Sequence, residues 1–168
     1  MDLRIPTVAV AVRIAQSGKP ELEAELFIAA ESRHDRAQLL EDLATMLDTA
    51  DTFVPVRANG VVRLVGKHAL AWVAVHRRGA EATLSTDFPD EPSEVITLYD
   101  RQHRVELVLA DGSITGLLLD SLPADHPRVL DYLNHAPRFV RLWTPEAHVF
   151  VNKQRILEVI ELGSESAD

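Results

Sequence analysis

An internal repeat constrains the fold of this chain more than any other feature. Residues Leu43–Val75 align without a gap with Val129–Glu161, so that each residue has a counterpart 86 positions later. Seven of the 33 aligned pairs are identical, whereas average residue usage would give about two by chance. We therefore expect a duplicated structural unit, which accounts for most apolar positions before any function is considered. The identical pairs are Leu47/Leu133, Ala50/Ala136, Phe53/Phe139, Val54/Val140, Val65/Val151, Lys67/Lys153 and Val73/Val159.

Apolar periodicity predicts the elements that open the first copy. Val8–Ile14 and Leu22–Ile28 each place an apolar side chain at every second position, and the stretch 16–20 between them is typical of a turn. Between Ser32 and Asp48 the apolar residues recur every three or four positions, which predicts an amphipathic helix. The first copy should therefore begin with a hairpin followed by a helix.

The rest of the first copy predicts further strands. Phe53–Val56 forms the next one, Asn59-Gly60 is a tight-turn pair, and Val61–Val75 supplies one long or two short strands. The second copy repeats this order around an Asp111-Gly112 hairpin signal. Its expected elements are strands at Val105–Leu109, Ile114–Leu119, Phe139–Trp143, Val149–Val151 and Ile156–Leu162, and a helix at Arg128–His135.

These elements predict an α+β, β-rich fold of two tandem β-β-α-β-β modules with antiparallel, strongly curved, small-barrel-like sheets. The first module covers residues 1–78 and the second covers residues 100–162. Residues 79–99 are expected to be an acidic linker that can hold an edge strand, and residues 163–168 a disordered tail.

Composition excludes several classes of protein. The chain has no cysteine, which rules out disulfides, a thiol nucleophile and thiolate metal ligands. It has no apolar run of the roughly 18 residues that a membrane-spanning helix needs. The N-terminus alternates and includes Arg13, unlike a secretory signal. We expect a cytoplasmic protein that does not enter a membrane.

Two parts of the repeat resemble a known family of small barrels. The stretch Val149–Lys153 with Ile156 and Val159 resembles the closing strands of Sm-like and other SH3-like small β-barrels. The stretch from Val105 through Asp111-Gly112 to Asp120 is similar to the opening hairpin of the Sm-like family. The resemblance implies a small curved sheet and RNA binding. However, the net charge of −9 repels phosphates, so we disfavour nucleic acid as a partner.

Lys67 and Lys153 are the one identical polar pair of the repeat. They could be a pair of cationic anchors for an acidic partner, one in each module. We favour the alternative that each is a corner residue that fixes a turn between strands, because exposed lysines usually carry solubility rather than sites.

The histidines raise the hypothesis of a metal site. The densest cluster is Asp125-His126 with Asp131 and His135, of which the last two are spaced for one face of a helix. A zinc site needs three or four converging ligands, whereas two such residues on one short helix are commonly a surface pair. We therefore predict no metal, and keep a metal-dependent enzyme at Asp125-His126 as the least favoured reading.

Hydrolytic and phosphate-binding motifs are absent. No serine lies in a nucleophile-elbow pattern and no glycine-rich phosphate loop occurs. Acidic pairs such as Glu41/Asp42 fall on the predicted helix, where a solvated face is the simpler explanation. We therefore expect no enzyme and no cofactor.

The remaining candidates suggest binding of a protein. Trp143 follows a predicted strand close to Arg138 and Arg141, a combination suited to an acidic partner segment. We expect a non-catalytic, cytoplasmic protein-binding or scaffold protein that forms a homodimer, with Arg138, Arg141, Trp143, Lys67 and Lys153 as candidate contact residues. The alternative is an Sm-like nucleic-acid or nucleotide binder.

Overall fold

The computed structural model describes residues 7–29, 36–76, 101–120 and 129–163, and these form a β-rich fold with antiparallel strand pairing. The predicted linker at 79–99, the Asp125-His126 cluster and nearly all of the predicted tail lie outside the described residues. The first half contains β1 (Thr7–Gln16), β2 (Leu22–Ala29), α1 (Arg36–Asp48), β3 (Phe53–Ala58), β4 (Val61–Gly66), the 3-10 turn η1 (Lys67–Ala69) and β5 (Leu70–His76). The second half contains β6 (Arg101–Leu109), β7 (Gly112–Asp120), α3 (Val129–His135), β8 (Phe139–Trp143), β9 (Ala147–Asn152), η2 (Lys153–Arg155) and β10 (Glu158–Gly163).

The hairpins form where alternation and turn chemistry predict them. In β1, Val10, Val12 and Ile14 are buried, while the residues between them are exposed or half-buried. Asn59 and Gly60 have φ angles of 51° and 74° between β3 and β4, the left-handed conformation that an Asn-Gly turn adopts. The hairpins β1–β2 and β3–β4 confirm the predictions.

The stretch that the sequence left as one or two strands is divided by η1 into β4 and β5. The described part of each half therefore holds five strands, which corresponds to the predicted unit with its last strand stretch split in two. The described elements follow the same order in both halves, and both ends of β4 (Val61–Gly66) and β9 (Ala147–Asn152) lie 86 positions apart.

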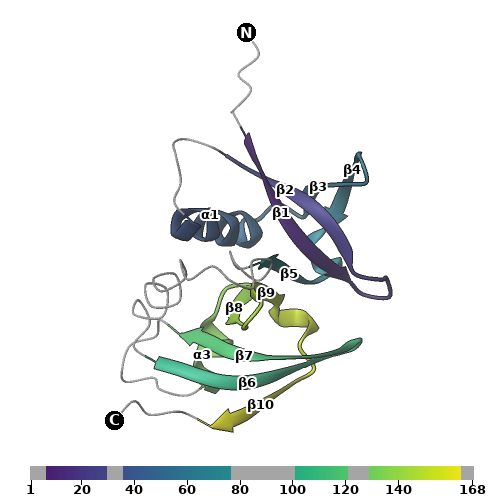
Figure 1. Ribbon diagram of the computed structural model, residues 1–168. Helices are drawn as coiled ribbons and strands as arrows, with labels where there is room; N and C mark the ends of the chain where they lie inside the picture. Colours follow the sequence, from purple (N-terminus) through teal and green to yellow (C-terminus); the bar gives the residue numbers. More distant parts are fainter. Residues whose placement is uncertain (1–6, 30–35, 77–100, 121–128, 164–168) are drawn as a thin grey trace, which may run out of the picture.

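All ten strands belong to one sheet, in the order β10-β6-β7-β8-β9-β5-β1-β2-β3-β4. The halves join because β5 pairs with β9, in a register that runs from Trp72 opposite Val151 to His76 opposite Ala147. The sequence predicted a separate sheet in each module, whereas the halves share one continuous sheet. Figure 1 shows β4 and β10 at opposite ends of the molecule, and in the sheet order they are the two end strands.

The core consists of two apolar clusters that cross the junction between the halves. The first lies under α1, whose Leu40, Leu43 and Leu47 are buried, and it includes Phe139 and Phe150 from the second half. The second cluster lies mainly among β6–β9 and α3 and includes Ala74 of β5. Each half therefore completes part of the other's core.

Candidate protein interface

The matched lysines bind the ends of the helices. Lys67 is only 1% exposed, and its ammonium donates hydrogen bonds to the Met46 carbonyl (2.8 Å), the Thr49 carbonyl (3.2 Å) and the Thr49 hydroxyl (2.8 Å). Lys153 donates to the carbonyl of Ala136 (2.7 Å), just after α3. Carbonyls at a helix C-terminus lack intrahelical donors and attract cations. Both lysines are thus corner residues that also cap a helix.

Burial is the main influence on the pKa of Lys67. Loss of water around the ammonium lowers its pKa below 10.5. The carboxylate of Asp51 opposes this shift, the nearby Arg138 guanidinium adds to it, and Asp48 opposes it. A lysine held in this way has no exposed charge to offer to a partner.

Arg138 and Arg141 lie where β8 meets α1. The backbone N–H of Arg138 donates to the carboxylate of Asp48 (3.2 Å). The guanidinium of Arg141 forms an ion pair with Glu41 and lies 5.7 Å from the centre of the Phe150 ring. These contacts connect β8 of the second half to the helix of the first. Trp143 is half-buried at the end of β8, where it pairs with His148.

Asn152 is a junction residue that sequence reasoning missed. It is fully buried, and its amide nitrogen donates to the carbonyls of Lys67 (3.3 Å) and Leu70 (2.9 Å) across the junction. Its amide oxygen accepts from the backbone of Gln154 (3.1 Å). The repeat held a signal for it, because its counterpart in the first copy is Gly66.

Exposed apolar side chains gather at the two ends of the sheet. On the β3–β4 hairpin they are Phe53, Val61, Val62 and Leu64, with Leu64 72% exposed. Around β10 and α3 they are Leu130, Leu157, Ile160 and Leu162, with Leu157 70% exposed. In the described part of the chain, the one other exposed large hydrophobic residue is Val8, on β1.

The β10 end also carries a groove. It has a volume of about 580 Å³ and lies between α3 and the segment 153–159. Leu130, Leu133, Ile156 and Val159 supply most of its apolar lining. We call it the α3–β10 groove.

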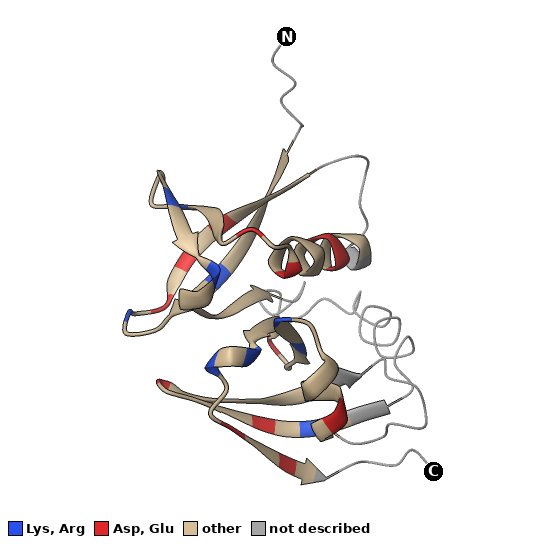
Figure 2. Cartoon of the chain, turned by 180° about the vertical axis from the view of Figure 1, so that it is seen from behind, with Lys and Arg blue, Asp and Glu red and all other residues tan. Residues whose placement is uncertain are grey.

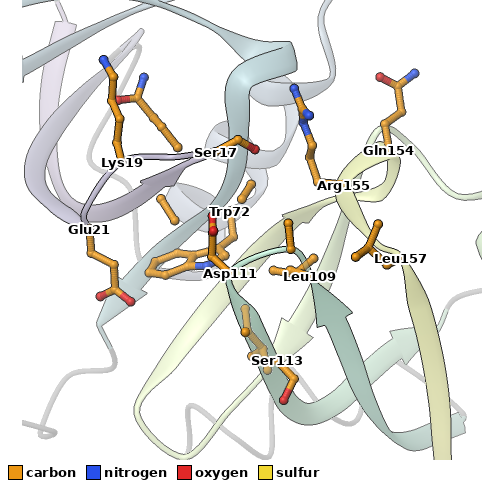
Figure 3. A pocket seen from close by; sticks show the side chains of 16 residues that line it. Ser17, Lys19, Glu21, Trp72, Leu109, Asp111, Ser113, Gln154, Arg155 and Leu157 are labelled. Atoms are coloured by element: carbon orange, nitrogen blue, oxygen red, sulfur yellow. The ribbon is translucent and has the colours of Figure 1, made fainter.

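A second hollow lies between the halves. It measures about 250 Å³ and is bounded by the β1–β2 turn, the β6–β7 turn and the segment 154–157. Figure 3 shows Trp72 and Asp111 among the side chains that line this pocket, with Lys19 and Glu21 on one side and Arg155 on the other. Arg155 already donates to the carbonyl of His68 (2.8 Å), so this contact also joins the halves.

The structure offers no metal centre among the described residues. No group of three His, Asp or Glu side chains converges there. His135 instead hydrogen-bonds through its ring to the backbone carbonyl of Asp131 (2.7 Å), and Asp125 and His126 lie outside the described ranges. Within the same ranges, neither helix has the length and apolar character needed to cross a membrane.

Comparison with protein-family models, with curated proteins and with solved structures finds no significant match for this chain.

Proposed function

We propose that this is a non-catalytic, cytoplasmic binding or scaffold protein of two duplicated small β-rich modules, whose two sheet edges engage protein partners. One observation carries the proposal. Eight of the nine large hydrophobic residues exposed in the described chain lie on β3–β4 or around α3 and β10, at opposite ends of the sheet. Exposed apolar side chains on an edge strand favour pairing with another chain.

Strand addition would use both the backbone and these side chains. An extended partner segment hydrogen-bonds to the free edge, while alternate side chains enter apolar pockets beside it. The α3–β10 groove supplies such a pocket next to β10. The described strands give β4 and β10 a neighbour on one side only.

Two of the described cations that the nucleic-acid alternative would use are already bound within the chain. Lys67 is buried under α1 and Arg155 is bound to the carbonyl of His68. Figure 2 shows acidic residues along α1 and on the strands around β10, among them Glu158 and Glu161 of β10. An acidic surface repels a phosphate backbone.

Photo-crosslinking tests the proposal. A photoreactive residue at Leu64 or Leu157 should capture a protein in cells, because each position projects from an edge region. The matched control is Val8, which is exposed but lies on β1, away from both edge strands. Equal capture at all three positions, or no protein captured at either edge, would count against edge-directed binding.

A further inference from the structure

The pairing of β9 with β5 inside the chain is a template for the contact that β4 and β10 would make with another chain. Strand β9 pairs with β5. The counterpart of β9 in the first half is the end strand β4, and the counterpart of β5 in the second half is the end strand β10, each of which has one strand neighbour among the described residues. Strand β4 is thus equivalent to β9, and strand β10 is equivalent to β5. Because β9 pairs with β5, the edges of β4 and β10 are suited to the same pairing.

Residues buried at the internal junction have exposed apolar counterparts at the free edges. Phe139 is 3% exposed, whereas its counterpart Phe53 is 55% exposed. On the other strand, Ala71 is 8% exposed and its counterpart Leu157 is 70% exposed. Phe139 is buried because it packs into the cluster under α1 of the other half, whereas Phe53 has no such half beside it among the described residues.

The α3–β10 groove corresponds to a site that is filled in the first half. Its residues Leu133, Ile156 and Val159 are the counterparts of Leu47, Leu70 and Val73. Those three belong to the cluster that receives Phe139 and Phe150 from the second half. The counterparts of these two phenylalanines are Phe53 and Leu64, both exposed.

The two edges are also complementary in charge. Strand β10 carries Glu158 and Glu161, and β4 carries Arg63. In the register of the internal junction, Arg63 faces Ile160 and lies diagonal to Glu158 on the same face. Diagonal neighbours on paired strands are within reach of long side chains.

We propose, building on the edge-binding function above, that the partner is a second copy of this chain, joined head to tail with its β4 against β10. Phe53 and Leu64 of one copy then occupy the α3–β10 groove of the next. The register transferred from the internal junction pairs Glu158 with Val65, Val159 with Leu64, Ile160 with Arg63, Glu161 with Val62 and Leu162 with Val61.

This contact is heterologous, so it forms a closed ring or an open filament. The smallest closed form is a pair of chains joined by two such contacts, which agrees with the homodimer expected from the sequence. The intermolecular contact lacks two polar links of the internal one, because the counterparts of Asn152 and Arg155 are Gly66 and Ala69. It is therefore the weaker and more reversible of the two.

Cysteine pairs test the register against a cysteine-free background. Chains carrying Arg63→Cys should form a disulfide with chains carrying Ile160→Cys upon mild oxidation, and neither variant should crosslink with itself. The control pair Arg63→Cys with Leu162→Cys is displaced by two residues, beyond the span that a disulfide bridges. Self-crosslinking of Arg63→Cys alone would contradict the head-to-tail contact, as would equal yields for the matched and displaced pairs.

Surface variants test the groove. Leu64→Asp and Leu157→Asp should each weaken self-association by about tenfold or more, which is the effect of losing one buried apolar side chain. Light scattering over a dilution series measures the self-association. Val8→Asp should leave it unchanged, because Val8 is exposed but lies on β1, away from both edge strands. Circular dichroism establishes that the variants are folded.

The two proposals can fail separately. A protein that stays monomeric at every concentration and gives no matched disulfide is not its own partner. If photo-crosslinking at Leu64 still captures a different protein, the edge-binding function stands without self-assembly. If neither edge captures anything, both proposals fall.

Discussion

The Lys67 ammonium donates a 2.8 Å hydrogen bond to the carbonyl of Met46, in the last turn of α1. The helix has no basic residue of its own in that turn, so the cation that stabilises its C-terminus comes from the corner after β4. Lys153 makes the corresponding contact with Ala136 after α3. The identity of these two lysines in the repeat thus has a structural cause.

Replacing Lys67 by methionine should lower the free energy of unfolding by about 2 kcal/mol, because hydrogen bonds from a charged donor are lost and buried carbonyls remain without them. Lys153→Met should cost less, about 1 kcal/mol, because Lys153 makes one such bond and is only half-buried. Urea denaturation measures both. Equal losses would mean that burial does not distinguish the two caps.

The stability that depends on Lys67 should vary with pH in a defined direction. Burial lowers its pKa in the folded protein, so between that value and 10.5 the unfolded chain binds more protons than the folded one. The free energy of unfolding contributed by Lys67 therefore rises with pH across this interval and is lost as the pH falls. The measurement is the difference between wild type and Lys67→Met in urea, taken from neutral pH to above 10.5. A difference that falls with increasing pH would refute the assigned direction.

Local structure was predictable where a short pattern determines it. Asn59-Gly60 specifies a turn because both residues accept positive φ, and they adopt it. The predicted strand Phe139–Trp143 has the observed bounds because its apolar residues are followed directly by Thr144-Pro145. Such features depend only on neighbours along the chain.

The junction was not predictable from these patterns. Pairing of β5 with β9 joins residues far apart in sequence, and alternation says nothing about which strands become neighbours. Lysines are rarely buried, so the sequence could identify Lys67 as a corner residue but not as a buried cap. Arg141 stays a candidate contact residue, but its ion pair with Glu41 of the same chain could not be foreseen from the sequence.

Asn152→Ala should destabilise the junction between the halves. The substitution leaves the buried carbonyls of Lys67 and Leu70 without the Asn152 donor, at a cost of about 1–3 kcal/mol. Asn134→Ala, on the exposed surface of α3, is the matched control and should cost little. Hydrogen exchange should show faster exchange in β5 and β9 for Asn152→Ala alone. Unchanged exchange in these strands would contradict the assigned role.

Gly116→Ala should separate β7 from β8. A Cβ at this position would lie 2.5 Å from the carbonyl oxygen of Trp143 and 3.0 Å from Leu142, so the backbone would have to move. We expect a loss of about 1–3 kcal/mol in urea denaturation, typical of overpacking. Ser113→Ala, on an exposed position of the same strand, should be nearly neutral. A neutral Gly116→Ala would mean that the two strands can shift without cost.

Both halves should unfold in one transition, because Phe139 and Phe150 of the second half belong to the cluster under α1. The two tryptophans allow a direct measurement, since Trp72 lies in the first half and Trp143 in the second. The variants Trp143→Phe and Trp72→Phe each keep one tryptophan as a fluorescent reporter. For each variant, the urea midpoint from tryptophan fluorescence should equal the midpoint from circular dichroism. Phe139→Ala should lower the midpoint seen by both reporters, with a loss of about 3–5 kcal/mol. If it shifted the Trp143 signal alone, the halves would be independent folding units.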